Sequence, residues 1–342
     1  MITDILATLI EGKDLSREAM TELMQTIMTG AATQAQIGAA LTALRVKGET
    51  VEEIAAAAEV MRGLSTKVAL STGGLVDICG TGGSGLPKFN VSTASAFVAA
   101  GAGVRVAKHG NRAASGKSGA ADVLEAAGVQ LTLTPEQVAH CVESVGVGFL
   151  FAQNHHSAMR HAVGARKELK FRTMFNLLGP LSNPAGTENQ VLGVFDPVWL
   201  RPLAEVLQRL GSRRVMVVHS EDGLDELSVA APTRVVELVN GTISEYSVSP
   251  EDVGIETQSW DDLRIENSQE SLALVMAALT GSHRTASDFV CLNAGAAIYV
   301  SGASENLAEG VAQAKQSIAS GAAKAKFDQL ISLTQQLTAD MP

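Results

Sequence analysis

The spacing of apolar and polar positions divides the chain into two parts with different secondary structure. In the first part, apolar side chains recur at helical spacing in stretches at 2–10, 14–30, 33–48 and 50–64. Thr50 followed by Glu53 has the spacing of a capping box, which marks a helix start. Because the connections between the stretches are short, the pattern predicts a small all-helical domain over residues 1–70.

The period changes from Leu75 onward, where short apolar stretches alternate with helical ones. The stretches typical of strands lie at 75–79, 104–110, 129–133, 148–152, 190–195, 214–220, 233–240 and 241–248, and helical patterns lie at 92–102, 135–145 and 202–210. Strands that alternate with helices favour a parallel sheet covered on both faces. We therefore predict a larger α/β domain over 73–342 with a mostly parallel central sheet flanked by helices. Residues 158–180 are helical again, and we expect them to return to the helical domain.

Composition and charge narrow the class of protein. Of the 342 residues 46% are apolar, and the formal net charge is −10, so the chain lacks the electrostatic footprint of a general nucleic-acid-binding protein. Cys79, Cys141 and Cys291 are scattered without C-x-x-C spacing, which is typical of a reducing compartment. The N-terminal stretch has no signal-peptide pattern, and the apolar run at 94–104 is too short to span a bilayer. We expect a cytoplasmic protein with neither a membrane nor a nucleic-acid partner.

The stretch VDICGTGGSGLPKFNVSTAS, at 76–95, contains G-x-G-x-x-G directly after a predicted strand. A dinucleotide site would need a helix at once and an acidic residue about 20 positions on, but LPKF intervenes and the next acidic residue after Asp77 is Asp122. GNRAASGKS, from Gly110, resembles a P-loop but has five residues between its glycines instead of four. Two interpretations remain for the first loop: a phosphate site made of backbone N–H groups and hydroxyls, or a tight turn in which Ser92 or Thr93 caps a helix.

Two further loops carry charged groups that suit a phosphorylated ligand. KHGNRAASGK, at 108–117, follows a predicted strand, and loops at the carboxyl ends of adjacent parallel strands converge on one crevice. A glycine-rich and a basic loop together would hold a multiply phosphorylated ligand. In HSEDGLDELS, at 219–228, the carboxylates of Asp222, Asp225 and Glu226 would suit Mg²⁺ beside substrate phosphates. An acidic turn that starts a helix is the alternative.

With these segments together, the chain is similar to the anthranilate phosphoribosyltransferases. GTGG with FNVSTASAFVAA, AKHGNRAASGKSGAADVLEA, RTMFNLLGPLSNPAG and HSEDGLDELS occur in the family's order and at its spacing, and the resemblance covers nearly the whole chain. It departs from the family's usual residues at Ser84, Lys88 and Ala120 in the phosphate cradle, and at Gln153 and Ser157 near the acceptor channel.

The resemblance implies a set of ligand-binding residues and no side chain acting as general acid or base. The positions that would contact phosphoribosyl pyrophosphate are Gly80, Gly83, Ser84, Lys88, Asn90, Val91, Ser92, Thr93, Lys108, His109, Gly110, Asn111, Arg112, Ala113, Ala114, Ser115, Gly116 and Ala120. Those for anthranilate are Gly80, His109, Asn111, His156 and Arg166, and those for Mg²⁺ are Ser92, Asp225 and Glu226. The family also implies a homodimer joined through the helical parts.

The activity implied is transfer of the 5-phosphoribosyl group from phosphoribosyl pyrophosphate to the amine of anthranilate, in tryptophan biosynthesis. Two alternatives stay open at this point. The first is an enzyme of the same fold with another acceptor, or a pyrimidine-nucleoside phosphorylase, which KHGNR argues against. The second is a non-catalytic relative that binds nucleic acid, which the charge of −10 opposes.

Overall fold

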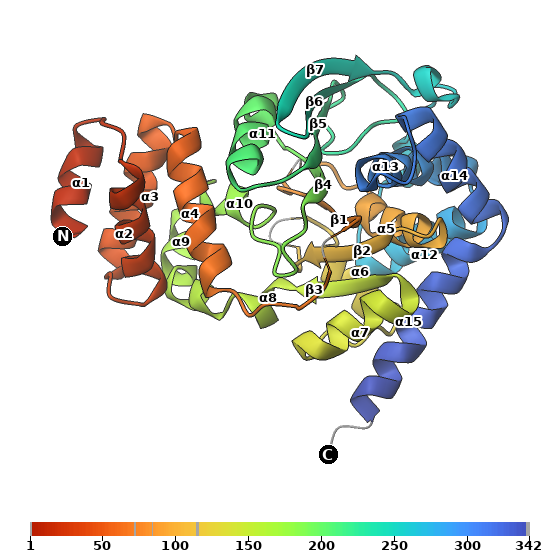
Figure 1. The fold of residues 1–342 in the computed structure, drawn as a ribbon, viewed down its shortest axis with the longest axis horizontal. Helices are drawn as coiled ribbons and strands as arrows, with labels where there is room; N and C mark the ends of the chain where they lie inside the picture. The colour runs from red at the N-terminus through yellow and green to blue at the C-terminus, as the bar shows by residue number, and fades with distance from the viewer. Residues whose placement is uncertain (1, 72, 84, 114–115, 340–342) are drawn as a thin grey trace.

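The computed structural model describes residues 2–71, 73–83, 85–113 and 116–339. Its N-terminal part consists of the helices α1 (Ile2–Ile10), α2 (Arg17–Met28), α3 (Gln34–Lys47) and α4 (Val51–Leu64). In Figure 1 they form the end of the molecule farthest from the sheet, together with α9 (Val163–Leu169). The apolar sides of α1–α4 share one core with α9 and with α10 (Phe175–Leu178).

Side-chain caps explain where these helices begin. Ser16 accepts a hydrogen bond from the backbone N–H of Ala19 at the start of α2, and Thr33 and Thr50 form capping boxes at α3 and α4. Such caps contribute about 1 kcal/mol each. The capping carboxylate of Glu53 is fully buried and also accepts from the backbone N–H of Leu15 and from Lys47 Nζ. It therefore links α4 to α3 and to the connection that precedes α2.

The central sheet has seven strands in the order β3-β2-β1-β4-β5-β6-β7. Their bounds are β1 Leu75–Gly80, β2 Arg105–Gly110, β3 Val147–Phe151, β4 Asn189–Gly193, β5 Arg214–Ser220, β6 Thr233–Val239 and β7 Thr242–Val248. The first five strands in this order are parallel, and the pairs β5–β6 and β6–β7 are antiparallel. The predicted fold class, a helical domain beside an α/β domain with a mostly parallel sheet, is confirmed. The chain moves outward in opposite directions from β1 and β4, so the carboxyl ends of these two strands form the topological switch point.

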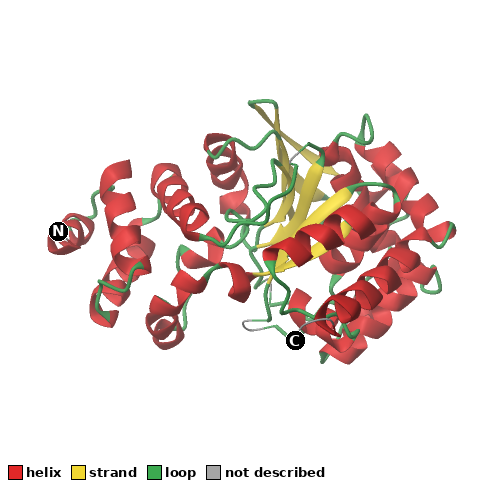
Figure 2. Ribbon diagram, turned by 60° about the horizontal axis from the view of Figure 1, so that its bottom comes forward, coloured by secondary structure: helices red, strands yellow, loops and turns green. Residues whose placement is uncertain are grey.

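Helices cover both faces of the sheet, as Figures 1 and 2 show. One face packs in a core with α5 (Val91–Gly101), α12 (Ser268–Thr280), α13 (Arg284–Ser301), α14 (Leu307–Ala319) and α15 (Ala322–Ala339), and this core also takes in α6 (Ala120–Ala126) and α7 (Pro135–Val145). The other face packs against α11 (Leu200–Arg209) and belongs to the core of the helical domain. Along β5, Val215 and Val217 enter this second core and Met216 and Val218 the first, as the two-residue period of a strand requires.

One predicted strand was wrong. Residues 129–133 have no regular structure, although Val129, Leu131 and Leu133 alternate with exposed residues as they would in a strand. Side chains of neighbouring helices take up the backbone hydrogen bonds that a partner strand would make. Gln130 N donates to Thr334 Oγ1, and the Leu131 carbonyl accepts from Asn154 Nδ2. The stretch therefore buries its apolar side as a connection between α6 and α7.

None of the helices in the described part of the chain combines the length and apolar character that a membrane span requires.

Candidate active site

The site is built over the switch point, where two strand-end glycines make room for an acidic turn. Gly80 of β1 pairs with Gly193 of β4, and Thr81 N donates to the Gly193 carbonyl at 2.9 Å. A Cβ on Gly80 would lie 2.8 Å from Oδ2 of Asp225, and a Cβ on Gly193 would lie 1.6 Å from the Asp225 carbonyl oxygen. Only glycine at both positions lets the buried Asp225 rest directly on the strand ends.

The glycine loop after β1 is held from the side by Arg172. Gly82 and Gly83 have φ of +66° and +79°, in the left-handed region that favours glycine. The Arg172 guanidinium donates to both of their carbonyls and lies 3.8 Å above the Phe195 ring. Sequence reasoning gave Arg172 no role, although it opens the motif RTMFNLLGP. It connects the predicted phosphate loop to the chain segment between α9 and α10.

The sequence analysis left open that Ser92 or Thr93 caps the helix after the glycine loop, and this alternative was wrong for α5. Asn90 is the N-cap and makes no side-chain cap bond, because its side chain bonds Ser118 and Ser271 instead. The Ser92 hydroxyl accepts from Lys108 Nζ at 3.2 Å. The Thr93 hydroxyl is buried and has no partner among the described atoms. This leaves a hydroxyl-bearing helix start beside the glycine loop.

Lys88 forms a buried ion triad with the acidic turn. Its Nζ lies 2.7 Å from Oδ1 of Asp225 and 2.9 Å from Oε2 of Glu226. Burial alone would lower the pKa of Lys88, but the two carboxylates outweigh it and raise that pKa, so the lysine is charged. Burial also opposes ionisation of Asp225, yet Lys88 holds the pKa of that carboxyl below its ordinary value. Burial and the Asp225 charge raise the pKa of Glu226 to about 8.

The basic loop after β2 contributes fewer free cations than its sequence suggests. Lys108 is buried and donates to the Ile78 carbonyl at 2.5 Å as well as to Ser92. Arg112 is paired with Asp122 and Glu125 of α6. Gly110 must be small, since a Cβ there would lie 2.8 Å from the Phe149 ring. The chain thus brings the ends of β1 and β2 together, but several cations are already paired.

Some of the other residues predicted to bind phosphoribosyl pyrophosphate lie in the described part of the chain, and some do not. Val91 is buried in the first turn of α5, Ala120 is the first residue of α6, and Asn111, Ala113 and Gly116 follow β2. The predicted contacts Ser84, Ala114 and Ser115 lie outside the described residues.

The residues predicted for the acceptor lie on β2, after α8 (Ala152–His155) and on α9. The rings of His109 and His156 are 5.1 Å apart, and both Nε2 atoms are buried without a hydrogen-bond partner among the described residues. Burial lowers the pKa of His109 to about 3 and that of His156 to about 4, so both rings are neutral at pH 7. The Arg166 guanidinium lies 5.5 Å over the Phe175 ring, and within the described chain no carboxylate pairs with it. Burial lowers its pKa, but an arginine remains charged.

Comparison with known proteins agrees with this architecture. Residues 72–324 match the family model described as "Glycosyl transferase family, a/b domain", and residues 3–65 match "Glycosyl transferase family, helical bundle domain". The chain is 60% identical to the anthranilate phosphoribosyltransferase of a Marinomonas species over 98% of this chain and 97% of that protein. The chain belongs to the anthranilate phosphoribosyltransferase family.

Two solved structures of this family superpose on nearly the whole chain. The anthranilate phosphoribosyltransferase of Thermus thermophilus has a TM-score of 0.92 and 44% identity, with 97% of this chain and 99% of that chain covered. The enzyme of Saccharomyces cerevisiae, solved in complex with PRPP and Mg, has a TM-score of 0.89 and 26% identity, with 98% of each chain covered. The likeness therefore includes the helical domain, the sheet and the loops over the switch point.

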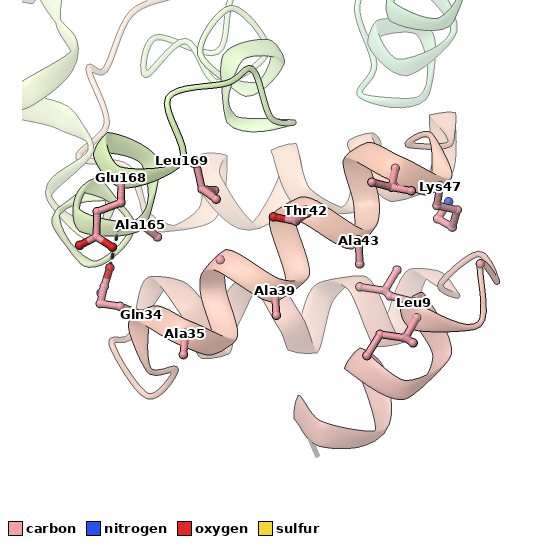
Figure 3. A pocket seen from close by; sticks show the side chains of 14 residues that line it. Leu9, Gln34, Ala35, Ala39, Thr42, Ala43, Lys47, Ala165, Glu168 and Leu169 are labelled. Carbon is pink, nitrogen blue, oxygen red and sulfur yellow. Dashed lines mark hydrogen bonds between the residues drawn. The ribbon is translucent and has the colours of Figure 1, made fainter.

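Away from the switch point, the helical domain carries an apolar groove that Figure 3 shows from close by. The groove has a volume of about 900 Å³ and lies between α1, α3 and α9. Small side chains of α3, among them Ala35 and Ala39, form its floor. Ile10 and Val46 line it and are 77% and 83% exposed. Exposed aliphatic side chains around a shallow apolar groove are typical of a protein interface.

Proposed function

We propose that this protein transfers the 5-phosphoribosyl group from phosphoribosyl pyrophosphate to the amine of anthranilate, with release of pyrophosphate. The observation that carries the proposal is the convergence at one switch point of a glycine loop, a hydroxyl-bearing helix start and the end of β2. Backbone N–H groups at such a position favour phosphate, and ligands of open α/β sheets bind there. Membership of the family supplies the acceptor and the reaction.

The chain's own groups suit a reaction that depends on position and charge. As the bond from C1 of the ribose to pyrophosphate breaks, negative charge develops on the leaving group and positive charge on the ring. The glycine loop and the start of α5 would stabilise the leaving pyrophosphate with N–H and O–H donors. The amine of anthranilate is unprotonated near neutral pH, so no strong base is needed, and a neutral Nε2 of His109 or His156 can accept one of its hydrogens. Holding the amine near C1 then accounts for most of the rate.

Arg166 is our candidate for the carboxylate of anthranilate. A charged guanidinium that is partly buried and has no acidic partner in the described chain can take a carboxylate through two parallel hydrogen bonds. Asn111 is the second candidate; its Oδ1 already accepts from the backbone N–H of Arg112 at 2.8 Å, which leaves its amide hydrogens available. The pair would orient the ring so that the amine faces the ribose.

Mg²⁺ would neutralise charge on the pyrophosphate, and the site fits it in part. The hydroxyl of Ser92 and the unpartnered, buried hydroxyl of Thr93 offer oxygen at the helix start beside the phosphate loop. Mg²⁺ commonly binds through substrate phosphates with one or two protein oxygens, so Ser92 can hold an ion that arrives with the substrate. The carboxylates of Asp225 and Glu226 do not fit as they stand, since Lys88 already lies against both.

A steady-state assay tests the proposal. Anthranilate fluorescence should fall when the protein, phosphoribosyl pyrophosphate and Mg²⁺ are all present, and should stay constant when any one is omitted. Constant fluorescence at micromolar enzyme would contradict the proposed acceptor. Phosphorolysis of thymidine or uridine would instead support a nucleoside phosphorylase. Salt-dependent binding of single-stranded DNA without binding of phosphoribosyl pyrophosphate would support the non-catalytic alternative.

The assembly that we propose is a homodimer in the cytoplasm, joined through the groove of the helical domain. The exposed Ile10 and Val46 would be covered by a second copy of the chain, which removes apolar area from water. The sequence division into a helical domain over 1–70, joined by 158–180, and an α/β domain over 73–342 suits this arrangement. The three cysteines are free thiols, as a reducing compartment requires.

A further inference from the structure

Lys88 is held by its backbone in a way that directs its side chain into the site. Lys88 forms an isolated antiparallel bridge with Arg264. On either side, Phe89 N donates to the Leu263 carbonyl at 3.3 Å, and Ile265 N donates to the Pro87 carbonyl at 2.7 Å. The side chain is only 12% exposed, so Lys88 is a fixed, buried lysine and not a mobile surface residue.

The ammonium of Lys88 lies where a divalent ion would bridge the two carboxylates. Its distances of 2.7 and 2.9 Å to Asp225 and Glu226 are those of ion pairs with one oxygen of each. An Mg²⁺ ion requires ligand oxygens at about 2.0–2.1 Å, so it cannot share the space between these two oxygens with the ammonium. The turn cannot retreat easily, because Asp225 rests on Gly80 and Gly193.

The described part of the protein supplies no third acidic, histidine or cysteine ligand beside the carboxylate pair. Within the described chain, no group of three or more His, Cys, Asp and Glu side chains is arranged to hold a metal ion. Ionising both of these buried carboxyl groups is costly unless a cation lies beside them. In this chain Lys88 provides that cation.

We propose that Lys88 is the resident cation of the Asp225–Glu226 pair and keeps divalent ions from binding there. One consequence of this inference rests on the proposed function. In the transfer reaction, Mg²⁺ would be bound by oxygens of phosphoribosyl pyrophosphate and not by this carboxylate pair. Lys88→Met removes the ammonium with little change in shape, and so it should turn the two carboxylates into a site for a divalent ion.

Mn²⁺ alone, titrated into the substrate-free protein and followed by electron paramagnetic resonance of the free ion, tests the proposal. The wild-type protein should bind Mn²⁺ at least tenfold more weakly than Lys88→Met, which should bind one ion per chain. The double variant Lys88→Met with Glu226→Gln should no longer bind that ion. Lys47→Met is the matched control, since it removes a buried lysine that contacts two carboxylates, Asp14 and Glu53, in the helical domain. Both carboxylate oxygens of Glu53 already accept backbone N–H groups, so the control should gain no ion.

Two results would overturn the proposal. One is a wild-type protein that binds one Mn²⁺ with the affinity of Lys88→Met and loses it on Glu226→Gln, which would mean that Lys88 moves aside for the metal. The other is a folded Lys88→Met protein, with unchanged circular dichroism, that gains no ion; Lys88→Gln replaces it if the methionine variant does not fold. Because no substrate is present, the result is independent of the transfer assay, and failure of either experiment is distinguishable from failure of the other.

Discussion

The buried histidines His109 and His156 make the stability of the protein depend on pH. His109 and His156 have pKa values of about 3 and about 4 in the folded protein, against about 6.5 in an unfolded chain. Burial is the main cause, and each ring also lies near another imidazole. At acidic pH these two rings bind more protons in the unfolded chain than in the folded protein, so their contribution to the free energy of unfolding decreases as the pH falls below about 6.5.

The magnitude follows from these values. Between about pH 8 and about pH 5, each ring gives a loss of about 2 kcal/mol in the free energy of unfolding, and the pair a loss of about 4 kcal/mol. Urea unfolding at both pH values measures the change. His156→Phe should recover about 2 kcal/mol of the loss at about pH 5 relative to about pH 8. The comparison at about pH 8 is the internal control, since there the rings are neutral in both states and any difference reports packing alone.

An equal dependence on pH in the wild-type protein and in His156→Phe would refute this reasoning. It would mean that the His156 ring reaches water or gains an acceptor partner in solution, so that its pKa is close to the ordinary value. The ring could then serve as a proton carrier near neutral pH, and its assignment as a neutral acceptor beside the substrate amine would be wrong.

Three further predictions test other parts of the site. Arg166→Ala should raise the KM for anthranilate by roughly 10–100-fold, because a charge-assisted pair worth about 1.5–3 kcal/mol is lost. The KM for phosphoribosyl pyrophosphate should change little. Equal effects on both KM values would contradict the assignment. Gly193→Ala should lower the free energy of unfolding by about 2 kcal/mol or more, seen in urea titrations, because its Cβ would overlap the Asp225 carbonyl. Val46→Glu should shift the protein to the monomer mass in light scattering, and an unchanged mass would exclude the groove as the interface.

Much of the fold could be predicted because its signals are local. The capping residues Thr33 and Thr50 and the apolar runs of β1, β2 and β5 determine their elements from short stretches of chain. The order of the strands could not be predicted in the same way, because pairing of β1 with β4 joins segments more than a hundred residues apart. Residues 129–133 show the same limit, since alternating burial looks identical with or without a partner strand.

The site was predictable in its backbone and less so in its side chains. Parallel strands place their carboxyl ends together, so the glycine loop, the end of β2 and the acidic turn had to converge. The side-chain pairs depend on distances that sequence does not contain. Arg112 is paired within its own loop and helix, Arg172 holds the glycine loop from a distant segment, and Lys88 lies between the carboxylates that were predicted to bind Mg²⁺. Each of these contacts changes which charges are free for a ligand.

The most direct test of the central claim is to identify the product. The protein is incubated with phosphoribosyl pyrophosphate, anthranilate and Mg²⁺, and pyrophosphate and N-(5-phosphoribosyl)anthranilate are quantified by mass spectrometry. We predict that the two products appear in equal amounts and that neither forms without anthranilate. Pyrophosphate released at the same rate without anthranilate, or no phosphoribosylated anthranilate at any enzyme concentration, would contradict the proposed transfer.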